Sequence, residues 1–177
     1  MPASIFGPTD EVHVQQHGSR CRMWIPPEIK DPVLLHAPTH KSVGYFGAVR
    51  WRDGRFVFRL ETGKFNGPSF LNSSSNSAPP AAAPGDAVVV ITDNAPYHPS
   101  RLRLPWREKH AHRLALDFFP PYSPELNPIE RVWKLARPRC LHNCYFENLK
   151  DIITAVEAEF ANWTTRNDVL RRLCAII

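Results

Sequence analysis

The sequence has no long uninterrupted run of apolar residues, although 43% of its 177 residues are hydrophobic. No segment approaches the roughly 18 consecutive apolar residues that a membrane-spanning helix needs, so we expect no membrane-embedded part. The first residues, MPASIFGPTDE, show neither a charged leader nor an apolar core, and we therefore expect no secretory signal. Internal repeats are also lacking, which leaves one domain with a single core as the expected organisation.

Cysteine is scarce, and the four cysteines are Cys21, Cys140, Cys144 and Cys174. Cys140 and Cys144 flank His142, a pattern that suggests zinc. No second pair lies at ligand spacing, so a zinc site is not the expected use of these residues. We expect reduced thiols, partly buried, in a cytosolic protein.

Neither sign of charge dominates, because 22 Lys and Arg residues stand against 17 Asp and Glu residues, a net charge of +5. This mild basic excess permits a polyanionic partner without requiring one. Two groups of basic residues are clustered in the sequence. Each cluster fits either contacts with phosphate groups or a solvated surface. The first cluster contains Arg131, Lys134, Arg137 and Arg139, and the second contains Arg101, Arg103, Arg107 and Lys109.

Strand patterns fill the first half of the chain and helical patterns fill the second. EVHVQQ at 11–16 indicates a short strand after a Pro-containing start, and residues 41–61 indicate a hairpin that turns at Asp53-Gly54. AVVVITD at 87–93 is typical of a strand buried on both faces, and 112–119 predicts another strand. Apolar residues at helical spacing and Pro positions predict helices over 99–110, 128–141, 148–163 and 168–176.

This element order predicts a mixed α/β sheet with helices packed on it. We expect a single domain over residues 1–177, interrupted by a low-complexity loop at 72–86 that is rich in Ser, Pro and Ala. Trp133 is expected in the core rather than as a platform for stacking bases.

Three acidic residues are candidates for a functional site. Asp93 ends the apolar strand, where open α/β sheets place their ligands. Glu130 falls at the third position of a helix that Asn127 caps and Pro128 begins, after a proline-rich approach. Asp10 opens the first strand and shares strand parity with Val12 and Val14, whereas Glu11 lies on the other face, so either acid remains a candidate.

Each acid also has a purely structural interpretation. Glu130 lies three residues after Asn127 and fits the second half of a capping box. Asp93 fits a turn that caps the next helix through Asn94, and His98 fits either a place near the carboxylates or a packing role. Asp10 fits a solvated terminal residue. If the three acids converge, they match the needs of magnesium, which prefers oxygen ligands and a few carboxylates.

The sequence resembles a known family in two blocks, ITDNAPYH at 91–98 and FFPPYSPELNPIERVW at 118–133. Both resemble the catalytic domain of DDE transposases, within the bacterial insertion-sequence branch related to mariner elements. DEVHVQQHGSRCRMW, HKSVGYFGAV, HNCYFENLKDIITAVEAEFANW and VLRRLCAII resemble further parts of that domain, so the resemblance covers nearly the whole chain.

The resemblance implies a ribonuclease H-like fold with a mixed five-stranded sheet flanked by helices. It implies that Asp10, Asp93 and Glu130 are catalytic and bind Mg²⁺ or Mn²⁺, and that the enzyme is a DNA endonuclease and strand transferase. Arg131, Lys134 and Arg137, which follow Glu130 on its helix, are then candidates for contacts with DNA.

The resemblance also implies partners: transposon ends, target DNA at a TA dinucleotide, and a second copy of the chain in a homodimer. Family members carry an N-terminal helix-turn-helix region, which we expect to be absent here and to be encoded separately. We expect a cytoplasmic, nucleoid-associated bacterial protein. The open alternative is a truncated, inactive remnant that at most binds DNA or a partner chain.

Overall fold

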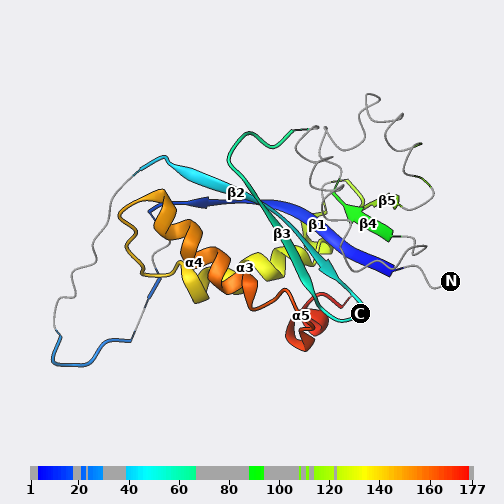
Figure 1. The fold of residues 1–177 in the computed structure, drawn as a ribbon. Helices are drawn as coiled ribbons and strands as arrows, with labels where there is room; N and C mark the ends of the chain where they lie inside the picture. Colours follow the sequence, from blue (N-terminus) through cyan, green and yellow to red (C-terminus); the bar gives the residue numbers. More distant parts are fainter. Residues whose placement is uncertain are drawn as a thin grey trace.

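The centre of the molecule is a five-stranded mixed sheet (Figure 1). The strands are β1 (Ser4–Gln15), β2 (Ser42–Arg50), β3 (Phe56–Glu61), β4 (Val88–Thr92) and β5 (Leu114–Phe118), in the spatial order β3-β2-β1-β4-β5. β2 pairs antiparallel with β1 and with β3, whereas β4 lies parallel to both β1 and β5. This computed structural model describes residues 4–17, 21–22, 24–29, 39–66, 88–93, 108, 111, 114–121 and 123–175.

The first strand is longer than the sequence predicts. It begins at Ser4 rather than at Glu11, and it runs through Pro8. The pairing register shifts between Phe6 and Thr9 on the β2 side and between Phe6 and Pro8 on the β4 side. Such an irregularity accommodates a proline, which has no N–H to donate to the ladder. Asp10 therefore lies inside β1 and does not open it.

Three helices cover one side of the sheet (Figure 1): α3 (Ile129–Cys140), α4 (Leu149–Ala161) and α5 (Asp168–Leu173). They confirm the predicted helices at 128–141, 148–163 and 168–176, with ends up to three residues shorter. A short 3₁₀ turn, η2 (Pro124–Leu126), precedes α3. The core between helices and sheet is strongly aromatic, and its buried rings include Tyr45, Phe56, Trp133, Phe160 and Trp163. Trp133, which is 3% exposed, is thus a core residue as expected.

Several predicted features lie outside the described residues. They are the loop at 72–86, Asn94, His98 and the second basic cluster; of the helix at 99–110, Glu108 is described and is helical. Within the described ranges, no helix is long and apolar enough to cross a membrane. The four cysteines are free thiols; Cys140 and Cys174 are buried, and Cys21 and Cys144 are exposed.

The turn between β2 and β3 is locked against the start of α5. Gly54 has a positive φ of 71°. The backbone N–H of Asn167, the N-cap of α5, donates to the carbonyl of Asp53 at 2.8 Å. A Cβ on Gly54 would lie 1.9 Å from the Asn167 carbonyl oxygen and 2.5 Å from the Arg171 nitrogen. The turn therefore needs glycine for its conformation and for its close approach to α5.

Replacing Gly54 with alanine is expected to lower the free energy of unfolding by about 2–4 kcal/mol, because strain at positive φ adds to a backbone clash. Urea denaturation measures this loss. Gly63→Ala is the matched control, since a Cβ there would meet only the Glu61 carboxylate, at 3.1 Å. Equal losses in the two variants would contradict the close packing of α5 on the turn.

Candidate active site

Asp10 and Asp93 are brought together by the pairing of β1 with β4. The two strands are parallel, and their register pairs Thr9 with Thr92, so the two aspartates are the next residues along each chain. Neighbouring strands lie about 4.8 Å apart. Paired residues of parallel strands project to the same face of a sheet. The backbone therefore places the two aspartates at adjacent positions.

Asp10 projects to the face of the sheet that the helices cover. On this face it alternates with Val12 and Val14, which pack against the helical core. Glu11 alternates instead with His13 and Gln15, both of which are exposed. Of the two neighbouring acids, Asp10 is thus the one that faces α3.

Glu130 reaches the same region through α3. One turn after Glu130, the ring of Trp133 lies against Gly47, where a Cβ would be 2.3 Å from the Trp133 Cη2 atom. Gly47 is the β2 residue that pairs with Asp10. Residues three apart lie on one side of a helix, so Glu130 and Trp133 share the side that faces the sheet near Asp10. Sequence reasoning did not single out Gly47, although an isolated glycine within a strand pattern signals a close approach.

The electrostatics of Asp10 agree with this convergence. The pKa of its carboxyl is raised from 3.8 to about 8, mainly by burial, although a hydrogen bond from the Glu11 backbone N–H opposes the increase. The negative charges of Glu11, Glu130 and Asp93 raise the pKa further. Among the described residues, every charged group that shifts this pKa is an acid. Asp10 is therefore a half-buried carboxyl among carboxylates, and this arrangement is costly when all of them are ionised.

These acids suit a divalent cation by their chemistry. Carboxylate oxygens are the ligands that Mg²⁺ prefers, and a cation would offset the repulsion that raises the pKa of Asp10. Among the described residues, no three His, Cys, Asp or Glu side chains stand close enough together to hold an ion. The donor set fits a metal, and the side chains would have to close around it.

The start of α3 differs from the prediction. The helix begins at Ile129 with Pro128 as its N-cap, so Glu130 is the second helical residue, not the third. Asn127 lies one residue earlier and accepts a hydrogen bond from the Ile129 N–H at 3.4 Å. The N-cap makes no side-chain hydrogen bond, whereas α4 has a full capping box. The capping-box interpretation of Glu130 is therefore wrong, and its carboxylate remains available for other contacts.

The first turn of α3 is supported by the end of α5. The Cys174 thiol approaches the Pro128 carbonyl at 3.8 Å, and Arg131 Nη1 donates to the Leu173 carbonyl at 2.9 Å. Arg131, predicted as a DNA contact, thus holds α5 with part of its guanidinium. Lys134 and Arg137 are exposed on α3.

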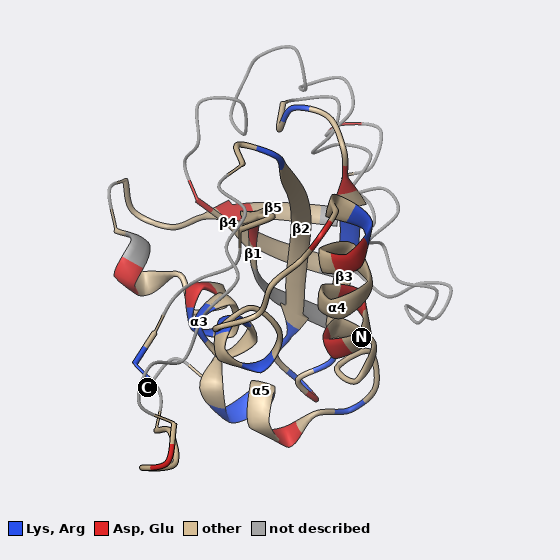
Figure 2. Cartoon of the chain, turned by 90° about the vertical axis from the view of Figure 1, so that its left-hand side faces the viewer, with Lys and Arg blue, Asp and Glu red and all other residues tan. Residues whose placement is uncertain are grey.

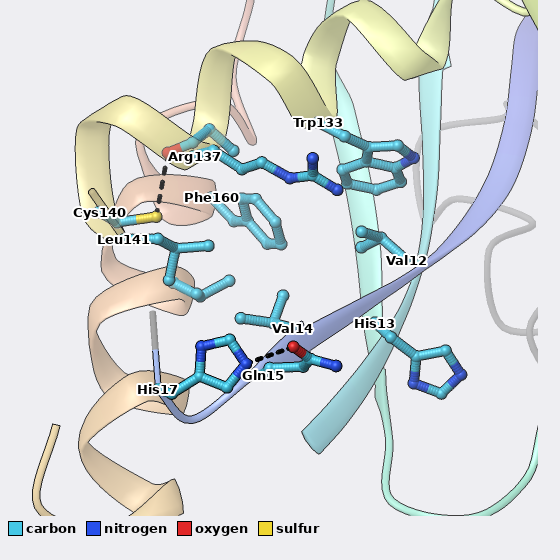
Figure 3. A pocket seen from close by; sticks show the side chains of 12 residues that line it. Val12, His13, Val14, Gln15, His17, Trp133, Arg137, Cys140, Leu141 and Phe160 are labelled. Carbon is cyan, nitrogen blue, oxygen red and sulfur yellow. Dashed lines mark hydrogen bonds between the residues drawn. The ribbon is translucent and has the colours of Figure 1, made fainter. Parts of the chain in front are cut away.

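A pocket of about 370 Å³ opens between β1 and α3, and none of the three candidate acids is among the described residues that line it. Val12, two residues after Asp10 on the same face, lines it together with Trp133 and Arg137. Figure 3 shows the Arg137 side chain extending along the α3 side of this pocket toward Trp133. The pocket therefore begins two residues beyond Asp10 along β1, and Arg137 is the cationic side chain that lines it.

Comparisons with known proteins agree with this picture. Residues 8–153 match the family model described as DDE superfamily endonuclease. A curated relative, the uncharacterized protein y4pE/y4sA of Sinorhizobium fredii, is 39% identical over 71 residues, which cover 40% of this chain and 48% of that protein.

Among solved structures, the Mos1 strand transfer complex matches with a TM-score of 0.67 at 16% identity, over 97% of this chain and 50% of that chain. The catalytic domain of Mos1 mariner transposase matches with a TM-score of 0.61 at 15% identity, over 97% of this chain and 75% of that chain. The chain spans about half the length of the curated relative and of the first of these structures. The likeness confirms the predicted ribonuclease H-like fold. Since the family model covers most of the sequence, this chain belongs to the DDE superfamily endonucleases.

Proposed function

We propose that this chain is the catalytic domain of a DDE transposase, which cleaves DNA at transposon ends and transfers the cleaved strands to target DNA. The observation that carries the proposal is the half-buried Asp10 carboxyl, whose pKa is raised partly by the charges of Asp93 and Glu130. Two separate strands and the first turn of a helix supply these acids. Family membership and the fold support the same activity.

Asp10, Asp93 and Glu130 would hold Mg²⁺ or Mn²⁺. When bound, a pair of such ions activates the attacking oxygen and stabilises the leaving oxygen at phosphorus. Mos1 paired-end complexes with Mn and with Mg support this choice of metal. The chain itself contributes positioning, because the β1–β4 register fixes two carboxylates and α5 supports the helix turn that carries the third.

The substrate is DNA, and α3 offers contacts to it. Lys134 and Arg137 follow Glu130 by about one and two helical turns, and both are exposed. Their charges would neutralise phosphate groups on either side of the cleaved bond, and Arg131 could add a contact through the part of its guanidinium that α5 does not use. Figure 2 shows basic positions on α3 beside the acidic one at its start.

The proposed activity implies an assembly. Mos1 structures include a paired-end complex with the left transposon end, which supports DNA ends as the partner here. We expect a homodimer that holds two ends, a separately encoded helix-turn-helix half that recognises them, and insertion at TA dinucleotides. Such a protein would work on the nucleoid in the cytoplasm. In this assembly, residues 1–177 would form the single catalytic domain, and the low-complexity loop at 72–86 would be part of it.

End-labelled DNA incubated with the chain and Mg²⁺ or Mn²⁺ tests the function. We expect cleaved strands with 3′-hydroxyl ends and joined products, and neither in the presence of a chelator. Digestion of arbitrary DNA without joining would favour a general nuclease of the same fold. If no metal-dependent product forms, even with a helix-turn-helix domain supplied, the chain is an inactive remnant and the proposed function is wrong.

A further inference from the structure

A second pocket, of about 380 Å³, lies where α5 meets the end of β2. Of the described residues, Trp51, Arg171, Arg172 and Ala175 line it. An indole offers one N–H donor and a guanidinium offers five, and neither side chain can accept a hydrogen bond. The described side chains around the pocket therefore provide donors and positive charge, which is the chemistry of an anion site.

Trp51 brings a donor that nothing in the described chain uses. Its ring packs against the aromatic core, but its Nε1 atom is buried and has no hydrogen-bond partner among the described residues. An unpaired buried donor costs about 1–3 kcal/mol. Nε1 is covered in the ligand-free chain, so a ligand that accepts its N–H would also have to uncover this atom.

The two arginines are held in place along α5. Nε of Arg171 donates to the Asp168 carboxylate and Nε of Arg172 donates to the Asp168 carbonyl, each at 3.2 Å. No hydrogen bond within the described ranges takes up their terminal amino groups. Arg166 also contacts the Asp168 carboxylate, at 3.4 Å, so two arginines share this one acid while Arg172 is held by the backbone carbonyl. The α5 helix carries Asp168 in its first turn and Arg171 and Arg172 in its last turn, so its end is positive (Figure 2).

Two contacts connect the end of α5 to the first turn of α3, which carries Glu130. Leu173, which follows Arg172, accepts the hydrogen bond from Arg131, the neighbour of Glu130. Cys174, beside Ala175, contacts the Pro128 carbonyl at the start of α3. A strand whose reacting phosphate lies at the carboxylates can thus continue over the end of α5.

We propose that the pocket formed by Trp51, Arg171 and Arg172 binds a backbone phosphate of the DNA strand, away from the cleaved bond. The proposal rests on the DNA substrate of the proposed function. Guanidinium groups bind phosphate oxygens through paired N–H bonds, and the Trp51 indole would add a further donor once binding uncovers its Nε1 atom. The contact is to the backbone, so it adds affinity and fixes the position of the strand without reading sequence.

Binding of a short fluorescent duplex, measured by anisotropy with a chelator present, tests the proposal. Arg172→Gln is expected to weaken binding about three- to tenfold. The slope of log affinity against log salt concentration is expected to become smaller by about one. Arg166→Gln is the matched control, because it removes the same charge next to the same acid, outside the pocket. It is expected to weaken binding less than about twofold. Equal weakening by both variants would mean that only diffuse charge matters and would overturn the proposal.

The indole N–H signal of Trp51, assigned by its loss in Trp51→Phe, gives a direct readout by NMR. The signal is expected to shift downfield when DNA is added and only weakly with inorganic phosphate. A shift with inorganic phosphate alone, or no shift with either, would overturn the DNA assignment. Because this measurement needs no metal or cleavage, metal-dependent cleavage with an unshifted Trp51 leaves the proposed function intact. A shift without cleavage leaves the pocket intact and removes the activity.

Discussion

Replacing Glu130 with glutamine is expected to lower the rate of metal-dependent DNA cleavage roughly a thousandfold, an effect of the size seen when a group that stabilises transition-state charge is removed. The helix should survive, because Glu130 is partly exposed and caps nothing at the start of α3. The change keeps the shape of the side chain and removes the charge that would hold the metal. Initial rates of strand cleavage in Mg²⁺ or Mn²⁺ measure the loss, and thermal melting checks the fold.

Glu125→Gln is the matched control for this experiment. Glu125 is exposed in η2, on the same approach to α3, and its substitution removes the same charge. We expect its cleavage rate to stay within about twofold of wild type. Asp93→Asn is expected to lose as much as Glu130→Gln, and the double variant little more, because groups that act as a unit are not additive. Wild-type cleavage by either single variant would remove that acid from the mechanism.

The positions of most elements follow from local patterns in the sequence. Asp53-Gly54 predicts the hairpin turn, the apolar run before Asp93 predicts β4, and the spacing of Ile152, Val156 and Phe160 predicts the buried face of α4. The acids were candidates on the same local grounds, since each follows or begins a recognisable element. Local patterns therefore predict the helices and strands, and the acidic residues that stand at or near their ends.

Contacts between distant segments are what the sequence leaves open. The register of Thr9 with Thr92 depends on a shift between Phe6 and Pro8, and a proline alone predicts only that a regular strand is weakened there. The pocket of Trp51 and Arg172 exists because α5 packs against the β2–β3 turn, a contact that no short pattern encodes. Glycine was the available signal, since Gly47 lies against the Trp133 ring of α3 and Gly54, in the β2–β3 turn, lies against the start of α5.

Replacing Asp10 with asparagine is expected to stabilise the metal-free protein, and increasingly so as the pH rises from about 4 to about 8. The pKa of Asp10 is about 8 in the folded chain against 3.8 for an unperturbed carboxyl, so the folded form keeps a proton that the unfolded form releases. The wild-type protein therefore loses stability through this window, by at most about 1.4 kcal/mol per pH unit. Asparagine carries no such proton, so this contribution to the slope should vanish. Urea denaturation at several pH values measures both slopes.

Metal should reverse the order of stability of the wild type and Asp10→Asn. Near pH 8, Mg²⁺ or Mn²⁺ is expected to raise the Tm of the wild type, because a ligand that binds only the folded form stabilises it, and to leave Asp10→Asn unchanged. Glu11→Gln is the matched control, since it removes the neighbouring charge on the opposite face of β1. It should keep the response to metal and most of the pH effect, but the window should end at a somewhat lower pH, because the charge of Glu11 helps to raise the pKa of Asp10. Parallel slopes in wild type and Asp10→Asn would mean that Asp10 is not confined among acids, and the carboxylate site built on it would have to be abandoned.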